Sequence, residues 1–179
     1  ELKYGIDGQW TSYTEYVKKV TSSTNANQTV TMNGGKQWLY GGLRMGGKSY
    51  YSLDLSTVTS TTGKPKLKFK IMPSGVCSTN NPLGCMGQSW SKPTITWVNW
   101  QGKRRVVKPG GGGYDKRYES LVNYNPTETD EGAGVYMFDA NDGSLLWWAS
   151  TNVGTNNVAT NKTYHANLNR SVVGGIKAV

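Results

Sequence analysis

Two stretches of this chain repeat the same order of short strands. One unit runs through WLYGGL, SYYSLDLS and PKLKFKI, and the other runs through RRVVKPGGGG, VYMFDA and SLLWWAS. In each unit an apolar strand leads into glycines, an aromatic-x-[Leu/Phe]-Asp strand follows, and a Gly-containing turn leads to a Leu-x-[Phe/Trp] strand. Repeated units of about four antiparallel strands are typical of β-propellers, whose blades pack side by side.

The repeat predicts an all-β fold made of β-propeller blades of four antiparallel strands. We place the blade-like units at about residues 1–72 and 88–150, within one domain that spans residues 1–179, and the start of a further blade at 171–179. Propellers close with about four to eight blades. About two blades plus one strand make an incomplete propeller, so we expect the chain to be a fragment of a longer polypeptide or to pack against other chains.

Composition favours strands and loops over helices. The 179 residues include 23 Gly, 7 Trp and 11 Tyr, and few segments show helical periodicity. The net charge of +9 permits an acidic partner, yet the basic residues are scattered and match no motif of a known nucleic-acid reader. The sequence has no apolar run long enough for a membrane span.

The segment PKLKFKI alternates lysine with apolar residues at a period of two. It predicts that Leu67, Phe69 and Ile71 face one side of a sheet and that the lysines face the other. A row of lysines on one face discourages pairing with a foreign strand, so we expect an outer edge strand here.

Four polar segments are expected to be loops that a rigid propeller presents to a partner. The first of them is interpreted as a long connection with one weak strand. These segments are residues 11–35, 77–85, 116–131 and 151–167.

Cys77 and Cys85 bracket the segment CSTNNPLGC. Its Asn, Pro and Gly residues suit a small surface loop closed by a disulfide, which indicates an oxidising compartment. A zinc site would need two more ligands, and His165, the single histidine, cannot supply both.

The turn DANDGS has two interpretations. Asp139, Asn141 and Gly143 match the start of an Asp-x-Asn-x-Gly calcium loop, but a strand follows at once and no later glutamate completes the site. Asn-Asp-Gly between two apolar runs is also a hairpin turn signal. We predict a hairpin and no cofactor in this segment, with Asp139, Asn141 and Asp142 kept as weak metal-ligand candidates.

An enzyme is not expected. GQSWS is one residue from the G-x-S-x-G nucleophile elbow, and Ser89, Asp139 and His165 follow the chain order of an α/β-hydrolase triad. That motif needs a strand, a sharp turn and a helix, whereas Ser89 leads into a predicted strand.

Aromatic side chains are candidates for stacking on sugars. Trp147 and Trp148 are neighbours in a strand and point to opposite faces, so at most one can face solvent. The three tryptophans in residues 90–100 are expected to pack between blades, which leaves Trp10 as the freest ring. The candidate ligand-binding residues are Trp10, Arg44, Lys48 and Tyr114.

Five segments taken in order resemble the C-terminal β-propeller of PilC/PilY proteins, large adhesins associated with the tips of type IV pili. The resemblance spans residues 4–179, and simple propeller repeats lack the GQSWSKP and GGGYD elements between them. It implies a non-catalytic part of a tip-associated adhesin and assembly protein, which presents loops to a surface or ligand. The family supports pilus biogenesis, twitching motility and, in some bacteria, DNA uptake. The segments are LYGGLRMGGKSYYSLDLS, MGQSWSKPTI, GGGGYD, GAGVYMFDANDGSLLWW and NRSVVGGIKAV.

The resemblance also implies partners and a location. The partners are minor pilins, the rest of the same polypeptide, and a host or abiotic surface, with a glycan or DNA as ligand. The location is extracellular, at the pilus tip on the outer cell surface, after export through the periplasm. In the family an aspartate-rich calcium loop commonly follows a stretch like SVVGGIKAV, so the resemblance allows calcium in a loop downstream and carries it over to no residue here.

Lys108 and Pro109 depart from the family pattern, which has apolar residues there, and this puts the end of that strand in question. The alternative is a quinoprotein-like propeller scaffold in the cell envelope, because FDANDGSLLWW also resembles the blade motif of that group. A quinone-dependent dehydrogenase would add an adjacent Cys-Cys pair and an acidic calcium set, and the sequence has neither.

Overall fold

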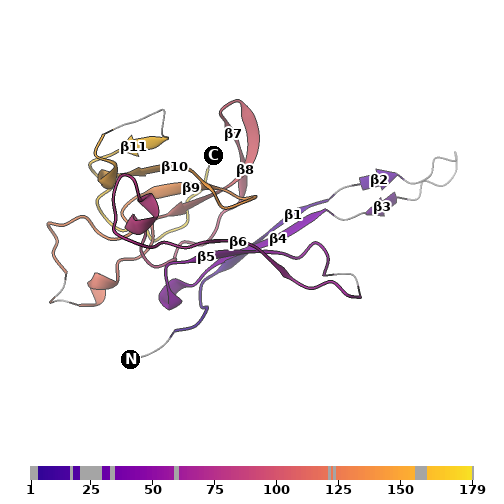
Figure 1. Cartoon of the computed structure of the whole chain (residues 1–179), viewed down its shortest axis with the longest axis horizontal. Coiled ribbons are helices and arrows are strands. Elements are labelled where there is room, and N and C mark those ends of the chain that lie inside the picture. Colours follow the sequence, from indigo (N-terminus) through magenta and orange to yellow (C-terminus); the bar gives the residue numbers. More distant parts are fainter. Residues whose placement is uncertain are drawn as a thin grey trace.

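The computed structural model of the chain describes residues 4–16, 18–20, 30–32, 35–58, 61–120, 122, 124–155 and 161–178. The described residues form strands and short 3₁₀ helices (Figure 1), which confirms the all-β prediction. None of these helices has the length and apolar character needed to cross a membrane. The strands are β1 Trp10–Glu15, β2 Lys18–Val20, β3 Val30–Met32, β4 Lys36–Gly42, β5 Tyr50–Asp54, β6 Lys66–Ile71, β7 Thr96–Trp100, β8 Lys103–Gly111, β9 Val135–Asp139, β10 Leu145–Ser150 and β11 Lys162–Tyr164. The 3₁₀ helices are η1 Arg44–Gly46, η2 Pro82–Cys85, η3 Lys116–Glu119 and η4 Thr151–Val153.

The strands form two principal sheets. The first is antiparallel in the order β1-β4-β5-β6. The second is an antiparallel meander of β7, β8, β9 and β10, and β11 joins it parallel to β10. Each sheet thus contains a four-strand antiparallel unit, which is compatible with an incomplete propeller, while the division into blades stays a prediction.

The core lies between the two sheets. Tyr50 and Ile71 of the first sheet share one buried cluster with Phe138 and Trp148 of the second. A second cluster joins Trp38 and Tyr40 to Val106 and Ala140, and the Tyr40 hydroxyl donates a 2.7 Å hydrogen bond to the Ala140 carbonyl. Large aromatic rings from both sheets therefore contribute to the apolar core that holds the sheets together.

The expectation of a connection at residues 11–35 is wrong for its first part. β1 pairs with β4 along its whole length, from Trp10 opposite Gly41 to Glu15 opposite Lys36. β2 and β3 extend this hairpin into a long arm (Figure 1). Residues 21–29 and 33–34 lie outside the described part of the chain.

The strict alternation expected for β6 is also wrong. The register shifts between Ser52 and Leu53 of β5, so that Phe69 pairs with Ser52 and Leu67 pairs with Leu53. This bulge leaves Leu67 57% exposed and places the Lys68 ammonium 4.0 Å from the centre of the Trp38 ring. The expectation of an edge strand is confirmed, because β6 ends the first sheet.

Lys108 and Pro109 do not end their strand, because β8 continues to Gly111. Lys108 is buried, and its ammonium lies 3.6 Å from the centre of the Tyr50 ring. The lysine therefore occupies an apolar position of the strand by packing under an aromatic ring.

Residues 171–178 form no regular strand, although a further strand was expected there. Ser171 makes an isolated bridge to Ala133. The Val172 carbonyl accepts a 3.1 Å hydrogen bond from the Gly113 amide. This segment is thus fastened to the second sheet at single points.

Segments from both sheets meet around Ser89, at a place that we call the glycine junction. The Ser89 hydroxyl accepts a 2.7 Å hydrogen bond from the Leu43 amide. The Gly87 amide donates to the Gly112 carbonyl, and the Gly112 amide donates to the Gly134 carbonyl, both at 2.9 Å. The junction is built from backbone groups that approach closely because glycines line it.

Candidate functional site

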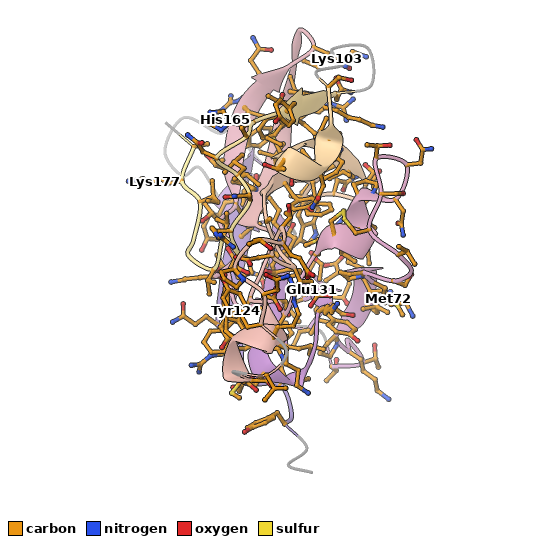
Figure 2. The ribbon with its side chains drawn as sticks, turned by 90° about the vertical axis from the view of Figure 1, so that its left-hand side faces the viewer. Met72, Lys103, Tyr124, Glu131, His165 and Lys177 are labelled. Carbon is orange, nitrogen blue, oxygen red and sulfur yellow. A yellow bond between two sulfur atoms is a disulfide. The ribbon has the colours of Figure 1, made fainter. Side chains whose placement is uncertain are left out.

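A cleft of about 560 Å³ opens where three of the four predicted loops come together. We call it the loop cleft. Figure 2 shows the face of the molecule on which Glu131, one of its lining residues, lies. The lining residues are Gly75, Cys77, Gly84, Cys85, Asp115, Lys116, Arg117, Thr129, Asp130, Glu131 and Asn152.

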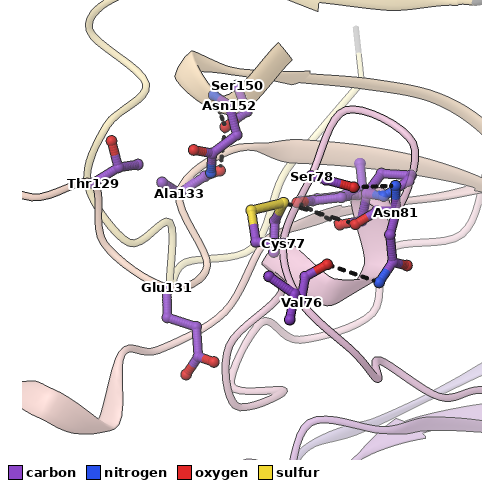
Figure 3. Close-up of a disulfide and its surroundings, with 12 residues drawn as sticks. Val76, Cys77, Ser78, Asn81, Thr129, Glu131, Ala133, Ser150 and Asn152 are labelled. Atoms are coloured by element: carbon purple, nitrogen blue, oxygen red, sulfur yellow. Dashed lines mark hydrogen bonds between the residues drawn. A yellow bond between two sulfur atoms is a disulfide. The ribbon is translucent and has the colours of Figure 1, made fainter. Parts of the chain in front are cut away.

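The first wall is the disulfide loop. Cys77 and Cys85 are bonded, as the sequence predicted, with Cys77 exposed and Cys85 buried (Figure 3). Inside the loop the Asn81 side-chain amide donates hydrogen bonds to the carbonyls of Ser74 and Val76, at 2.9 and 3.0 Å. These contacts fix the loop in one shape, as small polar turns do when an asparagine bonds to the backbone.

The second wall is fixed by one buried carboxylate. Asp115 accepts hydrogen bonds from the Arg117 guanidinium, the shortest of 2.7 Å, and from the Glu131 amide at 2.8 Å. Burial alone raises the pKa of Asp115, but the hydrogen bonds from Arg117 and Glu131 outweigh it, and the pKa lies below its ordinary value. Arg117 also reaches the Glu128 carboxylate at 2.8 Å, so one guanidinium holds both ends of the loop.

A second buried carboxylate ties the loop to the end of the chain. Asp130 accepts hydrogen bonds from the Tyr118 hydroxyl, from Arg170 at 3.3 Å and from the Ser171 amide at 3.2 Å. At the edge of the cleft Glu131 forms an ion pair with Lys48. The loop that contains these acids is therefore held from three directions.

The disulfide loop and the acidic loop are joined directly. The Cys85 carbonyl accepts a 2.8 Å hydrogen bond from the Gly132 amide. On the far side the Ser150 hydroxyl donates to the Ala133 carbonyl at 2.7 Å and accepts from the Asn152 amide at 3.1 Å (Figure 3). The cleft is thus a polar surface in which Asp115, Arg117, Asp130 and Glu131 have partners within the protein and Lys116 is exposed, an arrangement that suits recognition of a polar ligand.

The predicted ligand candidates do not form one site. The Arg44 guanidinium lies 4.5 Å from the centre of the Trp90 ring, and the Tyr114 ring lies 4.6 Å from the same ring. Lys48 instead pairs with Glu131 at the edge of the loop cleft. Trp10 packs flat on Gly41, since a Cβ there would stand 2.1 Å from the indole.

Apart from Cys77 and Cys85, the residues that line the loop cleft were not singled out one by one from the sequence. Lys116, Arg117 and Asp130 fall within a predicted presenting loop, but nothing in their spacing indicates that they meet the disulfide. The signal that could have found them is the pair of loops of similar polarity on either side of the GQSWSKP and GGGYD elements.

The tryptophans of β10 behave as expected, whereas one of the three in residues 90–100 does not. Trp148 is buried in the core, and Trp147 is half-buried with its indole donating to Thr163 at 2.9 Å. Trp97 was expected to pack between blades but is 42% exposed.

The turn after β9 is a hairpin, as predicted. The Asp139 carboxylate accepts from the Asn141 amide at 2.8 Å and from Arg105 at 2.9 Å. Asp142 accepts from the Ser144 amide at 2.8 Å, and the Asn141 side chain accepts from Lys68 at 3.1 Å. Each of the three weak metal-ligand candidates therefore bonds to N–H groups of the protein, and the described residues hold no cluster of three His, Cys, Asp or Glu suited to a metal.

Ser89, Asp139 and His165 are not assembled into a triad. Ser89 is engaged in the glycine junction, and Asp139 is paired with Arg105. His165 is exposed, and its Nδ1 accepts a 3.3 Å hydrogen bond from the Asn167 amide.

Comparison with known proteins gives a structural similarity. No protein-family model and no curated protein matches the sequence. The chain is similar to the crystal structure of the Pseudomonas aeruginosa PilY1 C-terminal domain, with 19% sequence identity and a TM-score of 0.41 over 76% of this chain. The match covers 21% of that structure's chain.

Proposed function

We propose that the chain is a non-catalytic part of a pilus-associated, adhesin-like surface protein. The observation that carries the proposal is the glycine junction. Four segments that resemble PilC/PilY proteins, scattered along the sequence, contribute Leu43, Gly87, Gly112 and Gly134 to it. A resemblance whose elements meet at one structural point is better supported than a set of isolated motif matches.

In this proposal the junction is the rigid support, and the loop cleft is the surface that it presents. The disulfide that closes one wall supports export to an oxidising compartment, where such bonds persist. The finer assignments are part of the same proposal: a location at the tip of type IV pili, contacts with minor pilins, and roles in pilus biogenesis, twitching motility and DNA uptake.

The proposal is tested by deleting the gene in the organism that encodes it and restoring it with single variants. Lys116→Glu changes an exposed charge on the cleft wall, and Lys64→Glu makes the same change in the loop before β6, away from the cleft. We expect the deletion to reduce surface attachment and the number of pili. Lys116→Glu should reduce attachment at an unchanged number of pili, whereas Lys64→Glu should behave as wild type.

The alternative, a quinoprotein-like scaffold in the cell envelope, predicts a different phenotype. A deletion that leaves pili and attachment intact but disturbs other envelope proteins would support it and contradict the adhesin proposal. Equal effects of Lys116→Glu and Lys64→Glu would retain the pilus role but reject the loop cleft as the presented surface.

A further inference from the structure

The two sheets diverge at the end of the molecule opposite the loop cleft. The β7–β8 ribbon points away from the arm formed by β1 and β4 (Figure 1). Where the sheets part, Tyr13 and Ile95 still pack against the core cluster of Trp38 and Val106. Around Tyr13 the two sheets carry neighbouring aromatic and cationic side chains, and we call this group of side chains the wedge. Its residues are Tyr13, Lys36, Trp38, Lys68, Trp97 and Arg104.

Each cation of the wedge lies against an aromatic ring. Lys68 and Lys36 lie 4.0 and 5.2 Å from the centre of the Trp38 ring, and Arg104 lies 4.6 Å from the centre of the Trp97 ring. Trp38 is only 6% exposed, whereas Trp97 is 42% exposed. The wedge therefore offers one open ring, that of Trp97, with a guanidinium beside it.

Trp97 lies beside the first sheet. Burial is the main cause that raises the pKa of Tyr13, and the neighbouring Trp97 side chain acts in the opposite direction, while the Tyr13 hydroxyl donates a 3.3 Å hydrogen bond to the Glu15 carboxylate. The backbone of Trp97 pairs with that of Val106, whose side chain belongs to the core. A flat ring on a paired strand loses little conformational entropy when a ligand stacks on it.

The charge of the wedge is positive and partly uncompensated. Lys36 is paired with Glu15 at 3.2 Å. Among the described residues no carboxylate lies within ion-pair distance of Arg104. Lys68 bonds to the neutral Asn141, and nearby Asp54, Asp139 and Asp142 compensate part of its charge. An anionic group in the wedge would pair with Arg104 without displacing a carboxylate.

The open ring borders a hollow of about 460 Å³, lined by Trp97, Val98, Asn99, Gly102 and Arg104. The turn beside it is a tight two-residue hairpin turn, in which Gln101 and Gly102 both have positive φ, 50° and 73°. The hollow thus combines a flat apolar surface, an amide and a guanidinium within one hairpin.

We propose that the wedge binds an acidic sugar unit of a glycan. The apolar face of the sugar's pyranose ring fits against the Trp97 indole, and the carboxylate of the sugar pairs with the Arg104 guanidinium. The Asn99 side-chain amide forms hydrogen bonds with the hydroxyl groups of the sugar. Single-stranded nucleic acid fits less well, because it needs a row of rings on which successive bases stack. Here Trp97 and Trp100 point to opposite faces of the ribbon, so they form no such row. The proposal is independent of the pilus-associated role.

The ribbon provides a matched control. Arg104 pairs with Asn99 on the face of the wedge, and Lys103 pairs with Trp100 on the opposite face. Arg104→Gln and Lys103→Gln remove the same charge from neighbouring positions, so their comparison separates the proposed site from general attraction of a basic protein. Trp97→Leu keeps an apolar side chain over Val106 while removing the flat ring.

The test is calorimetric titration of the full chain with oligogalacturonate, with its methyl ester and with an oligothymidylate of equal charge. Circular dichroism confirms the fold of each variant. We expect oligogalacturonate to bind and its neutral ester to bind at least about tenfold more weakly. Arg104→Gln and Trp97→Leu should each weaken binding about tenfold, and Lys103→Gln less than about twofold.

Four results would overturn the proposal. The first is that oligogalacturonate does not bind, and the second is that its methyl ester binds as tightly as oligogalacturonate itself. The third is that Lys103→Gln weakens binding as much as Arg104→Gln, which would show general electrostatic attraction without a specific site. The fourth is that the oligothymidylate binds as tightly as the sugar and that its binding depends on Trp97, which would assign the wedge to nucleic acid.

Discussion

Gly113 and Gly132 lie back to back, so closely that a Cβ added at Gly132 would stand 2.3 Å from the Gly113 carbonyl oxygen. Gly132 also has a φ of +78°, which favours glycine. Through its amide, Gly132 bonds to Cys85 of the disulfide loop. Gly132 therefore connects the glycine junction to the loop cleft, and the effect of replacing it on stability can be measured.

Gly132→Ala should lower the free energy of unfolding by roughly 3 kcal/mol, because it adds backbone strain and a steric overlap. Gly102→Ala is the matched control, since its φ is +73° and nothing lies within 4 Å of the new Cβ. The control should cost only about 1 kcal/mol. Urea unfolding followed by tryptophan fluorescence measures both, and equal losses would show that the close approach is not important.

The stability of the protein should depend on Asp115 more than on Glu128, although both carboxylates of the loop cleft region bind Arg117. The Asp115 side chain is 1% exposed and that of Glu128 is 57% exposed. Asp115→Asn should cost about 3 kcal/mol of unfolding free energy, because it leaves a buried network unpaired. Glu128→Gln should cost less than about 0.5 kcal/mol. Thermal unfolding compares the two variants, and a similar loss of stability in both would show that the buried carboxylate of Asp115 contributes no more than the exposed one of Glu128.

The two cysteines should not be equivalent when they are replaced. Freshly purified protein is expected to contain no free thiol by mass spectrometry. The double variant Cys77→Ser/Cys85→Ser should lose about 2–3 kcal/mol from the lost cross-link. Cys85→Ser should cost more than Cys77→Ser, because only Cys85 is buried and its replacement places a hydroxyl in an apolar cluster. The reverse order would contradict the burial of Cys85.

Lys108 should make stability depend on pH. Burial lowers the pKa of Lys108 to about 7, against about 10.4 in an unfolded chain. Between these values the unfolded chain binds a proton that the folded chain does not, so raising the pH favours the fold. This group contributes at most about 1.4 kcal/mol per pH unit, and below about pH 7 its contribution no longer changes.

Comparison with Lys108→Met isolates this effect. The difference in unfolding free energy between wild type and variant should shift in favour of wild type from about pH 7 to about pH 10. Measurements stop there, since burial raises the pKa of Tyr50 and the ionisation of such tyrosines in the unfolded chain then opposes folding. A difference that stays flat across this range would show that Lys108 is charged in the folded protein throughout.

The sequence predicted the strands that carry apolar side chains and missed those that do not. β9 and β10 were found because VYMFDA and SLLWWAS are apolar on both sides of a glycine turn. β1 was missed because it reads WTSYTE, and its pairing with β4 arises from the partner strand. The bulge at Lys68 was also invisible, since period-two alternation in PKLKFKI gives no sign of an extra residue.

The candidate sites were less predictable than the fold. The disulfide follows from local composition, whereas the cleft beside it needs contacts between residues distant in sequence, such as Cys85 with Gly132. Trp97 was assigned to packing because nothing in the sequence shows that the sheets diverge at that point. Exposure depends on the arrangement of the sheets, which strand patterns do not determine.

The glycine junction also has a consequence for how the protein reaches its fold. Its partners Leu43 and Ser89 are separated by 46 positions in the chain, and close by the Ser91 hydroxyl donates a hydrogen bond to the Gly174 carbonyl, 83 positions away. Contacts of such long range require large loops to close before they stabilise anything, and proteins rich in them fold slowly. The local hairpins can therefore form early, while their docking at the junction sets the rate at which the chain becomes protected from aggregation and proteolysis.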